Sequence, residues 1–219
     1  MLAADGDDFA RHVRGVIARE EHHHIRYFPR LRRTAERLAR GKLLELLRTL
    51  SFQRRRVVLA SGKESDFFID CKQAVLTAEG HALTGPLLRE AIGAFALPAQ
   101  AVAGVELGGC PLASAVAYAS FQAGAPLDAI YVRKESKDHG SRRLLEGDGR
   151  LSPGAAVAIV EDVITTGGST LKAAEKLRAA GYAIAGVVAL VDRLEGGRQA
   201  LEAEGLAVAS LYTRTDFIP

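Results

Sequence analysis

The sequence predicts an α/β fold in which a mainly parallel β-sheet is flanked by helices. From about residue 100 onward, short apolar segments alternate with segments of helical periodicity, as in repeated strand–helix–strand units. The segment 155–160 (AAVAIV) is apolar at every position, which is typical of a strand that is covered on both faces. A hairpin pattern before this alternation predicts a smaller N-terminal unit.

Composition favours a single globular domain that works in the cytoplasm. The chain has 219 residues, of which 48% are hydrophobic and 25% are charged. Its apolar segments are too short to cross a membrane, and no secretory signal pattern is present. Cys71 and Cys110 form no CxxC pair, so we expect two reduced cysteines in place of a disulfide or a zinc site.

Residues 1–33 are expected to be a basic extension of unknown role, followed by one domain over residues 34–219. The extension clusters arginines and contains His22, His23 and His24, but shows no amphipathic period. A basic segment can bind nucleic acid, yet solvated arginine-rich helices are more common and aromatic residues are sparse here. Nucleic-acid binding is therefore disfavoured.

Three elements are expected before the alternating part. Leucines gather on one face of the segment 34–50, which predicts a docking helix. The apolar segments 57–60 and 67–69 surround a Gly-containing turn at 61–65, which predicts a β-hairpin. A helix should follow from Thr77, its N-cap, toward Phe95, with Pro86 marking a kink or a boundary.

The alternating part predicts five strands and three helices. Apolar runs indicate strands over 101–105, 128–132, 155–160, 183–191 and 206–212. Helices are expected from Pro111 to near Gly124, over 169–180 and near 199–204. Leucine and alanine line one face of the second of these helices, and Gly181 is its natural C-terminal stop. The polar stretch 133–150 is expected to be a long loop.

The turn after the strand at 155–160 has the composition of a phosphate site. A helix N-terminus at the carboxyl end of a strand offers free N–H groups and a partial positive charge to an anion. Gly167 and Gly168 would let the backbone approach that anion, while Thr165, Thr166 and Ser169 would add hydroxyl donors. The alternative interpretation is an ordinary turn and N-cap, where the same residue types are common.

Glu161 and Asp162 distinguish these two interpretations. Carboxylates would repel a phosphate, so we expect them to face hydrogen-bond donors such as ribose hydroxyls. The segment has neither the GK[ST] of a Walker A loop nor the GxGxxG of a dinucleotide fold. Instead, VEDVITTGGST resembles the motif of type I phosphoribosyltransferases that binds 5-phosphoribosyl-1-pyrophosphate (PRPP). The resemblance implies ribose 5-phosphate in the turn and the ribose 2- and 3-hydroxyls on the two acids.

The polar loop that begins at the end of the strand 128–132 gathers cationic donors. Arg133, Lys134, Lys137 and His139 lie within seven positions, which would suit a leaving pyrophosphate. A solvated connection is the plainer alternative. The sequence RKESKDHG resembles the RKxxKxHG loop of orotate phosphoribosyltransferases. In that family the loop is mobile and closes over the neighbouring subunit's site, which implies a homodimer in which the loop 133–150 reaches the partner.

Two further segments resemble the same family, and the resemblance runs from about Lys42 to the C-terminus. LASGKESDFFID is similar to the family's hood hairpin, so the hood would span about 50–75 and the core 76–219. Phe68 would then pack on the flat pyrimidine with Ile69 behind it, although a core-strand role is an equal alternative. Arg193 matches the arginine that reaches the orotate carboxylate, and Thr165 also joins the orotate set by resemblance.

The chain departs from the family pattern at two positions. Some members have a lysine before the Ser-Gly of the hood, where this chain has Ala60, so the contact is missing or is made by Lys63. Certain members carry a second lysine where this chain has Gly108. The backbone N–H groups of Leu107, Gly108 and Gly109 would replace it, since consecutive amides form an anion nest.

The resemblance implies an enzyme of pyrimidine biosynthesis, a pentosyl-transferring glycosyltransferase that joins PRPP to orotate. Mg²⁺ would be bound mainly through PRPP, with no residue of the chain expected as a metal ligand. Orotate is already anionic, so catalysis would rest on positioning and on charge stabilisation of the leaving group. Two alternatives stay open: a purine or xanthine phosphoribosyltransferase, and a PRPP-sensing regulatory protein.

Overall fold

The structure is a computed structural model that describes residues 29–58, 64–135 and 144–218. The chain divides into two units between Arg40 and Gly41, and each is described by itself. Helix α2 (Pro29–Leu46) begins in the first unit and starts earlier than the expected helix. Because α2 runs through residues 33 and 34, no break in secondary structure marks the expected domain boundary there.

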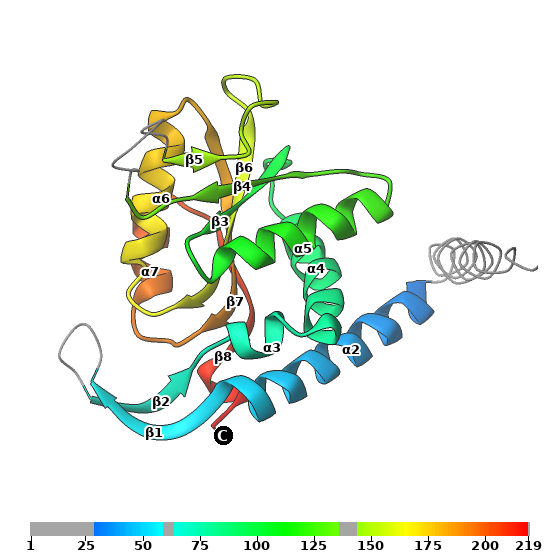
Figure 1. Ribbon diagram of the computed structural model, residues 1–219, viewed down its shortest axis with the longest axis vertical. Helices are drawn as coiled ribbons and strands as arrows, with labels where there is room; N and C mark the ends of the chain where they lie inside the picture. The colour runs from blue at the N-terminus through cyan, green and yellow to red at the C-terminus, as the bar shows by residue number, and fades with distance from the viewer. Residues whose placement is uncertain (1–28, 59–63, 136–143, 219) are drawn as a thin grey trace, which may run out of the picture. The chain divides into compact units, whose positions relative to one another are not determined.

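The second unit contains the predicted, mainly parallel sheet. Its six strands have the order β5-β4-β3-β6-β7-β8, and β5 is the one antiparallel neighbour in this order (Figure 1). The strands are β3 (Ala101–Val105), β4 (Asp128–Val132), β5 (Leu145–Glu146), β6 (Ala156–Ile164), β7 (Ala183–Asp192) and β8 (Val208–Thr213). The β3 and β4 bounds agree with the expectation.

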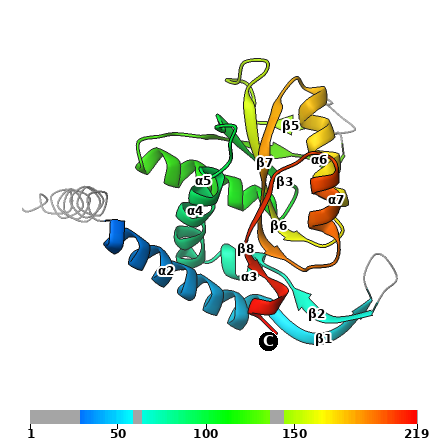
Figure 2. The same cartoon turned by 180° about the vertical axis from the view of Figure 1, so that it is seen from behind.

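Helices cover both faces of this sheet. They are α4 (Ala78–Ile92), α5 (Gly109–Gln122), α6 (Gly168–Ala179) and α7 (Gly197–Ala203). Figures 1 and 2 show α4 and α5 together on one face, with α6 and α7 on the other. Thr77 caps α4, since its hydroxyl accepts a hydrogen bond from the Gly80 N–H, and Gly181 follows α6 with a φ of 88°.

The predicted hairpin is confirmed as an antiparallel pair, β1 (Phe52–Val58) and β2 (Glu64–Ile69). A π-helical turn, η1 (Leu47–Ser51), connects α2 to β1. A short helix that the sequence did not predict, α3 (Lys72–Val75), follows β2. Residues 59–63, which include Ala60 and Lys63, lie outside the described residues.

Three expectations about the elements need correction. Pro86 lies inside α4 and marks no boundary, because it is exposed and water can bond the carbonyl that its missing N–H leaves unpaired. The strand expected to end at Val160 continues as β6 to Ile164, so both acids lie within it. The stretch 133–150 contains the strand β5, which pairs with the end of β4.

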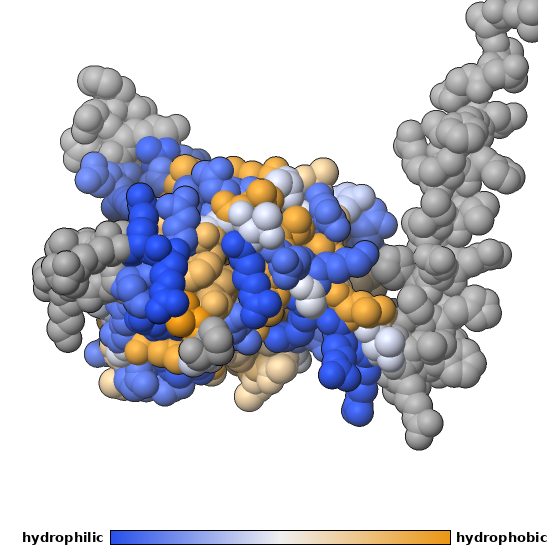
Figure 3. Space-filling view, turned by 90° about the horizontal axis from the view of Figure 1, so that it is seen from below, coloured by the Kyte–Doolittle hydropathy of each residue, from blue (hydrophilic) through white to orange (hydrophobic). Residues whose placement is uncertain are grey.

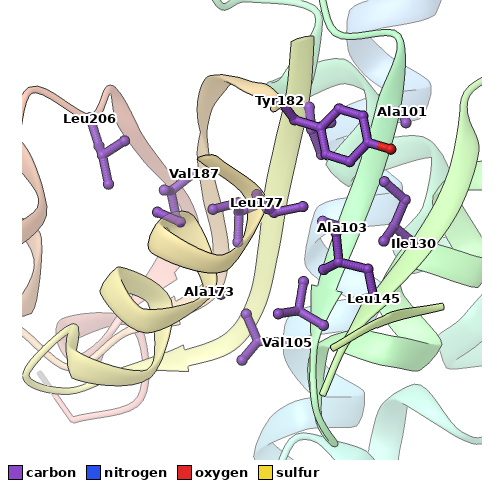
Figure 4. Packing of buried hydrophobic residues seen from close by; sticks show 14 of the residues in the cluster. Ala101, Ala103, Val105, Ile130, Leu145, Ala173, Leu177, Tyr182, Val187 and Leu206 are labelled. Atoms are coloured by element: carbon purple, nitrogen blue, oxygen red, sulfur yellow. The ribbon is translucent and has the colours of Figure 1, made fainter. Parts of the chain in front are cut away.

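A large apolar cluster lies between the sheet and α6. Side chains from β3, β4, β7 and α6 meet in Figure 4, with Leu177 of α6 fully buried among them. The buried members that Figure 4 labels are Ala101, Ala103, Val105, Ile130, Leu145, Ala173, Leu177, Tyr182, Val187 and Leu206. This packing fixes the N-terminus of α6 beside the carboxyl end of β6, where the candidate site lies.

Three further observations concern the surface, the character of the helices and the cysteines. Hydrophilic and apolar side chains are interspersed on the face that Figure 3 shows. Within the part of the chain that the structure describes, no helix has the length and apolar character needed to span a membrane. Cys71 and Cys110 are both free thiols and both are buried.

Candidate active site

The candidate site lies where the strand connections of the sheet change direction. β3 and β6 are neighbours, but the chain passes from β3 to β4 on one side and from β6 to β7 on the other. Ligands of open α/β sheets bind at such a switch point, outside the carboxyl ends of the strands. The loop 106–108 after β3 and the turn 165–167 after β6 therefore meet at this position.

The turn after β6 has the backbone geometry of an anion site. Gly167 adopts a φ of 81° and serves as the N-cap of α6, and its carbonyl accepts the first helical hydrogen bond, from the Leu171 N–H, at 2.9 Å. Thr166, Gly168 and Ser169 are exposed, and a Cβ built on Gly168 would have no neighbour closer than 3.9 Å. The helix N-terminus is thus open to a ligand.

Glu161 faces α6 from the interior of β6. Its Oε2 accepts hydrogen bonds from the Ser169 hydroxyl at 3.1 Å and the Thr170 hydroxyl at 3.2 Å. Burial, together with the neighbouring charge of Asp162, raises the pKa of Glu161 to about 8. Ser169, expected to bind phosphate, thus donates to this carboxyl group in the structure.

Asp162, the next residue of β6, lies against the loop after β3. A Cβ placed on Gly108 would lie 2.0 Å from its Oδ2, so the carboxylate lies directly against the loop after β3. Burial raises the pKa of Asp162, and the charge of Lys72 opposes that rise. A side-chain hydrogen bond also joins Asp162 to Glu161, so the two acids interact directly near the carboxyl end of β6.

The loop after β3 leads into the N-terminus of α5. Leu107 is exposed, Gly108 is half-buried, and Gly109 is the first residue of the helix. A Cβ on Gly109 would lie 2.5 Å from the Val160 carbonyl oxygen, so only glycine permits this approach of the loop to β6. The backbone of the expected anion nest thus lies beside the carboxyl end of β6.

The beginning of the cationic loop is held by two side chains. The Lys134 N–H donates to Glu106 Oε2 at 2.8 Å. The Lys176 ammonium group on α6 donates to the carbonyl oxygens of Arg133 and Lys134 at 2.7 and 2.8 Å. Arg133 also forms an ion pair with Glu146, at 3.5 Å. Lys137 and His139 lie outside the described residues.

The hood places its aromatic residues on two sides. Phe67 is fully buried and packs against Phe217 with ring centroids 5.7 Å apart, and Ile69 is buried as well. Phe68 alternates with them and is half-buried, with the Arg55 guanidinium 3.9 Å from its ring centroid. Ile69 therefore belongs to the buried side of β2 and Phe68 to the other side.

Arg193 connects the hood to the core. Its Nη2 donates to the Phe67 carbonyl oxygen at 2.9 Å and pairs with Glu195 Oε1 at 3.0 Å. Only 8% of the residue is exposed. The arginine expected to bind a substrate carboxylate is therefore paired with a carboxylate of the protein itself, close to the hairpin that carries Phe68.

Comparisons with known proteins agree with an anion-binding site at the end of β6. Residues 87–202 match the phosphoribosyl transferase domain family. The orotate phosphoribosyltransferase of Sorangium cellulosum (strain So ce56) is 70% identical over 181 residues, which cover 82% of this chain and 93% of that protein. The chain belongs to the orotate phosphoribosyltransferase family.

Solved orotate phosphoribosyltransferase structures have the same fold. The Mycobacterium tuberculosis H37Rv enzyme in complex with Fe(III) dicitrate superimposes with a TM-score of 0.71 at 39% identity, covering 83% of this chain and 99% of that one. The same enzyme in complex with PRPP gives a TM-score of 0.66 at 36% identity, covering 82% and 98%. The predicted type I phosphoribosyltransferase architecture is thereby confirmed.

Three supporting residues of this orotate phosphoribosyltransferase site escaped the sequence reasoning. Gly197 supports the turn after β6, since a Cβ there would lie 2.6 Å from the Thr165 carbonyl oxygen. Lys176 holds the start of the cationic loop. The charge of Lys72, at the start of α3, lowers the pKa of Asp162. The glycine pair 196–197, a few residues after a predicted strand, was an available signal, whereas the two lysines carry none without the structure.

Proposed function

We propose that this chain transfers the phosphoribosyl group of PRPP to orotate, giving orotidine 5-phosphate and pyrophosphate. The single observation that carries the proposal is the open turn 165–168 at the N-terminus of α6, flanked by the carboxyl groups of Glu161 and Asp162. Phosphate fits the turn and ribose hydroxyls fit the acids. The 70% identity to a curated orotate phosphoribosyltransferase supports orotate as the acceptor.

The donor would occupy the two loops at the switch point. The 5-phosphate would bind the backbone and hydroxyl groups of the turn 165–169, and the pyrophosphate would bind the amides of 107–109. Both loops precede helix N-termini, so helix dipoles favour the anion at each place. This arrangement would hold the glycosidic carbon between them.

Orotate would lie between the hood and the core. Phe68 would contact the pyrimidine face, and Arg193 would bind the orotate carboxylate in exchange for Glu195, its present partner. Because Arg193 also bonds the Phe67 carbonyl oxygen, orotate binding would be coupled to the position of β2. Lys63 and Thr165 complete the proposed acceptor set.

Catalysis would act on the leaving group. As the glycosidic bond breaks, negative charge grows on pyrophosphate, and Arg133, Lys134, Lys137 and His139 would stabilise it. Mg²⁺ would neutralise further charge on the phosphate oxygens. Within the described residues no cluster of three His, Cys, Asp or Glu side chains offers a protein cage for a cation. In this proposal the metal is carried on oxygens of PRPP.

We also propose a cytoplasmic homodimer in which the loop 133–150 reaches the partner's site. The outer face of α5 supports a contact between copies, since Tyr118 and Phe121 are 68% and 72% exposed there.

Sedimentation should give a mass twice that of the chain. A mixed dimer of the Lys137→Ala and Glu161→Ala chains should have one intact site, which combines Glu161 of one chain with Lys137 of the other. Mixtures of the two variants should therefore regain activity that neither has alone. A monomer, or mixtures without recovery, would overturn the shared-site proposal.

The transferase proposal is tested by following orotate absorbance with PRPP and Mg²⁺. Orotate should be consumed much faster than adenine, hypoxanthine, xanthine or uracil, and Lys137→Ala should lower kcat while PRPP still binds. A comparable rate with a purine base would favour the purine or xanthine alternative. Tight PRPP binding without turnover of any base would favour the PRPP-sensing regulator.

A further inference from the structure

One carboxylate of the core lies between two arginines. Glu195 Oε1 is 3.0 Å from Arg193 Nη2 and 3.9 Å from Arg214 Nη1. Arg193 directly follows β7, whereas Arg214 begins the 3-10 turn η2 (Arg214–Asp216) after β8. The Glu195 side chain is 20% exposed. Glu195 therefore has two guanidinium groups within reach, and in the structure it is closer to Arg193.

Both arginines also hold the hood. The Arg193 Nη2 donates to the Phe67 carbonyl oxygen at 2.9 Å, and the Arg214 Nη2 donates to Asp66 Oδ1. Asp66 and Phe67 are neighbours on β2, the strand that also carries Phe68. A change of partners among these charged groups would therefore act on the hood strand that is proposed to contact the pyrimidine.

The main chain around Glu195 is held in place. A φ of 57° at Leu194, uncommon for a residue other than glycine, turns the chain between the two paired side chains. The Leu194 N–H donates to Asp192 Oδ1 at 2.9 Å, and the Arg193 N–H donates to the Ile164 carbonyl oxygen at 3.0 Å. Because these bonds fix the backbone, Glu195 can change partners by a movement of its side chain alone.

We propose that Glu195 is an internal competitor for the acceptor carboxylate, which occupies Arg193 in the empty site and passes to Arg214 when the acceptor binds. With Glu195 in place only 10% of the Arg193 side chain is exposed, so an incoming carboxylate reaches this guanidinium by replacing Glu195. The displaced carboxylate is largely covered and needs a new cationic partner, and Arg214 is 3.9 Å away. This inference rests on the proposed function.

The test is equilibrium binding to the full chain of two nucleotides that differ only in the carboxylate, orotidine 5-phosphate and uridine 5-phosphate. Glu195→Gln should bind orotidine 5-phosphate about five- to tenfold more tightly than the wild type, because a neutral amide competes less well for the guanidinium. Uridine 5-phosphate carries the same phosphate and should bind with unchanged affinity. Glu204→Gln, which changes an exposed carboxylate at the end of α7, is the matched control and should match the wild type for both nucleotides.

Arg214→Met tests where Glu195 goes. Without Arg214 the displaced carboxylate loses its new partner, so orotidine 5-phosphate should bind about tenfold more weakly. In the double variant Glu195→Gln/Arg214→Met this loss should disappear, because no charge is displaced. A loss that persists in the double variant, or that is equal for uridine 5-phosphate, would show that Arg214 acts through Asp66 and the hood, and would overturn the exchange.

The outcomes separate this inference from the proposed function. Absence of orotate turnover by the wild type would refute the proposed function itself. An active wild type whose Glu195→Gln variant gains no affinity for orotidine 5-phosphate over uridine 5-phosphate would overturn the competitor role alone. Glu195→Ala is measured in parallel in case the glutamine variant folds poorly, and the same selective gain is expected of it.

Discussion

Replacing Glu161 by glutamine should make the unliganded protein more stable and the enzyme less active. Glu161 is 5% exposed, and its pKa is raised from an ordinary 4.5 to about 8 by burial and by Asp162. Between pH 4.5 and about pH 8, the folded protein therefore keeps a proton on Glu161 that the unfolded chain has released. The free energy of unfolding of the wild type must fall as pH rises through this window.

The size of the effect follows from the raised pKa. Ionising Glu161 inside the fold costs about 5 kcal/mol, which is fully expressed above pH 8 and absent below about pH 4.5. Glutamine still accepts hydrogen bonds from Ser169 and Thr170 but carries no charge. At pH 9 the Glu161→Gln protein should thus melt roughly 10 °C higher than the wild type, with almost no difference at pH 5.

The assay is thermal unfolding without ligand at about pH 5, 7 and 9, paired with kcat/KM for PRPP. At pH 9, where Glu161 of the wild type is ionised, we expect activity to fall about tenfold, because a neutral amide binds ribose hydroxyls less strongly than a carboxylate. Glu175→Gln, which changes an exposed carboxylate of α6, is the matched control and should show neither effect. A stability difference that is the same at all three pH values would refute the reasoning.

Three further changes test other parts of the site. Gly108→Ala should raise the KM for PRPP about tenfold with little change in melting temperature, because the methyl group of the alanine would displace the Asp162 carboxylate. An unchanged KM would contradict the placement of Asp162. Lys176→Met should lower kcat about tenfold and leave equilibrium PRPP binding intact, and Lys176→Arg should restore part of the activity. An equal loss of PRPP binding would argue against a role of Lys176 in positioning the loop. A chain that begins at Leu31 should stay soluble and keep most of its orotate activity, and a loss of catalysis would show that residues 1–30 do more than extend the chain.

The elements that sequence reasoning predicted are those with a long or pure apolar pattern. The strands 101–105 and 128–132 were placed to the residue, since each is a short apolar run bounded by polar or turn residues. The helix α3 and the strand β5 have four and two residues, which is too few for any periodicity to appear. Tertiary contacts determine such elements, so no local pattern could have predicted them.

The candidate site was predicted as a set of residues but not as an arrangement. Glu161 and Asp162 are adjacent in sequence, yet Glu161 accepts hydrogen bonds from hydroxyls of α6 and Asp162 lies against the loop after β3. Arg193 was selected for its guanidinium, yet its partner, the Phe67 carbonyl, lies 126 residues away in the chain. Contacts of that kind depend on how the hood packs on the core, which single-sequence patterns do not report.

The balance of charge in the described part of the site bears on how the proposed reaction would work. Glu161, Asp162 and Asp70 are all acidic, and Lys72 is the cation whose charge lowers the pKa of Asp162. A substrate with several phosphate groups would meet net repulsion from these side chains unless other cations join them. Helix dipoles at α5 and α6 offset only a part of this, since each is worth about 1 kcal/mol or less near the surface. The remaining charge would have to come from the loop that begins at Arg133 and from Mg²⁺ carried on PRPP. If the loop closes as the family resemblance implies, leaving-group stabilisation would arise on closure, which would place the cations at the transition state and would keep the open site accessible to substrate.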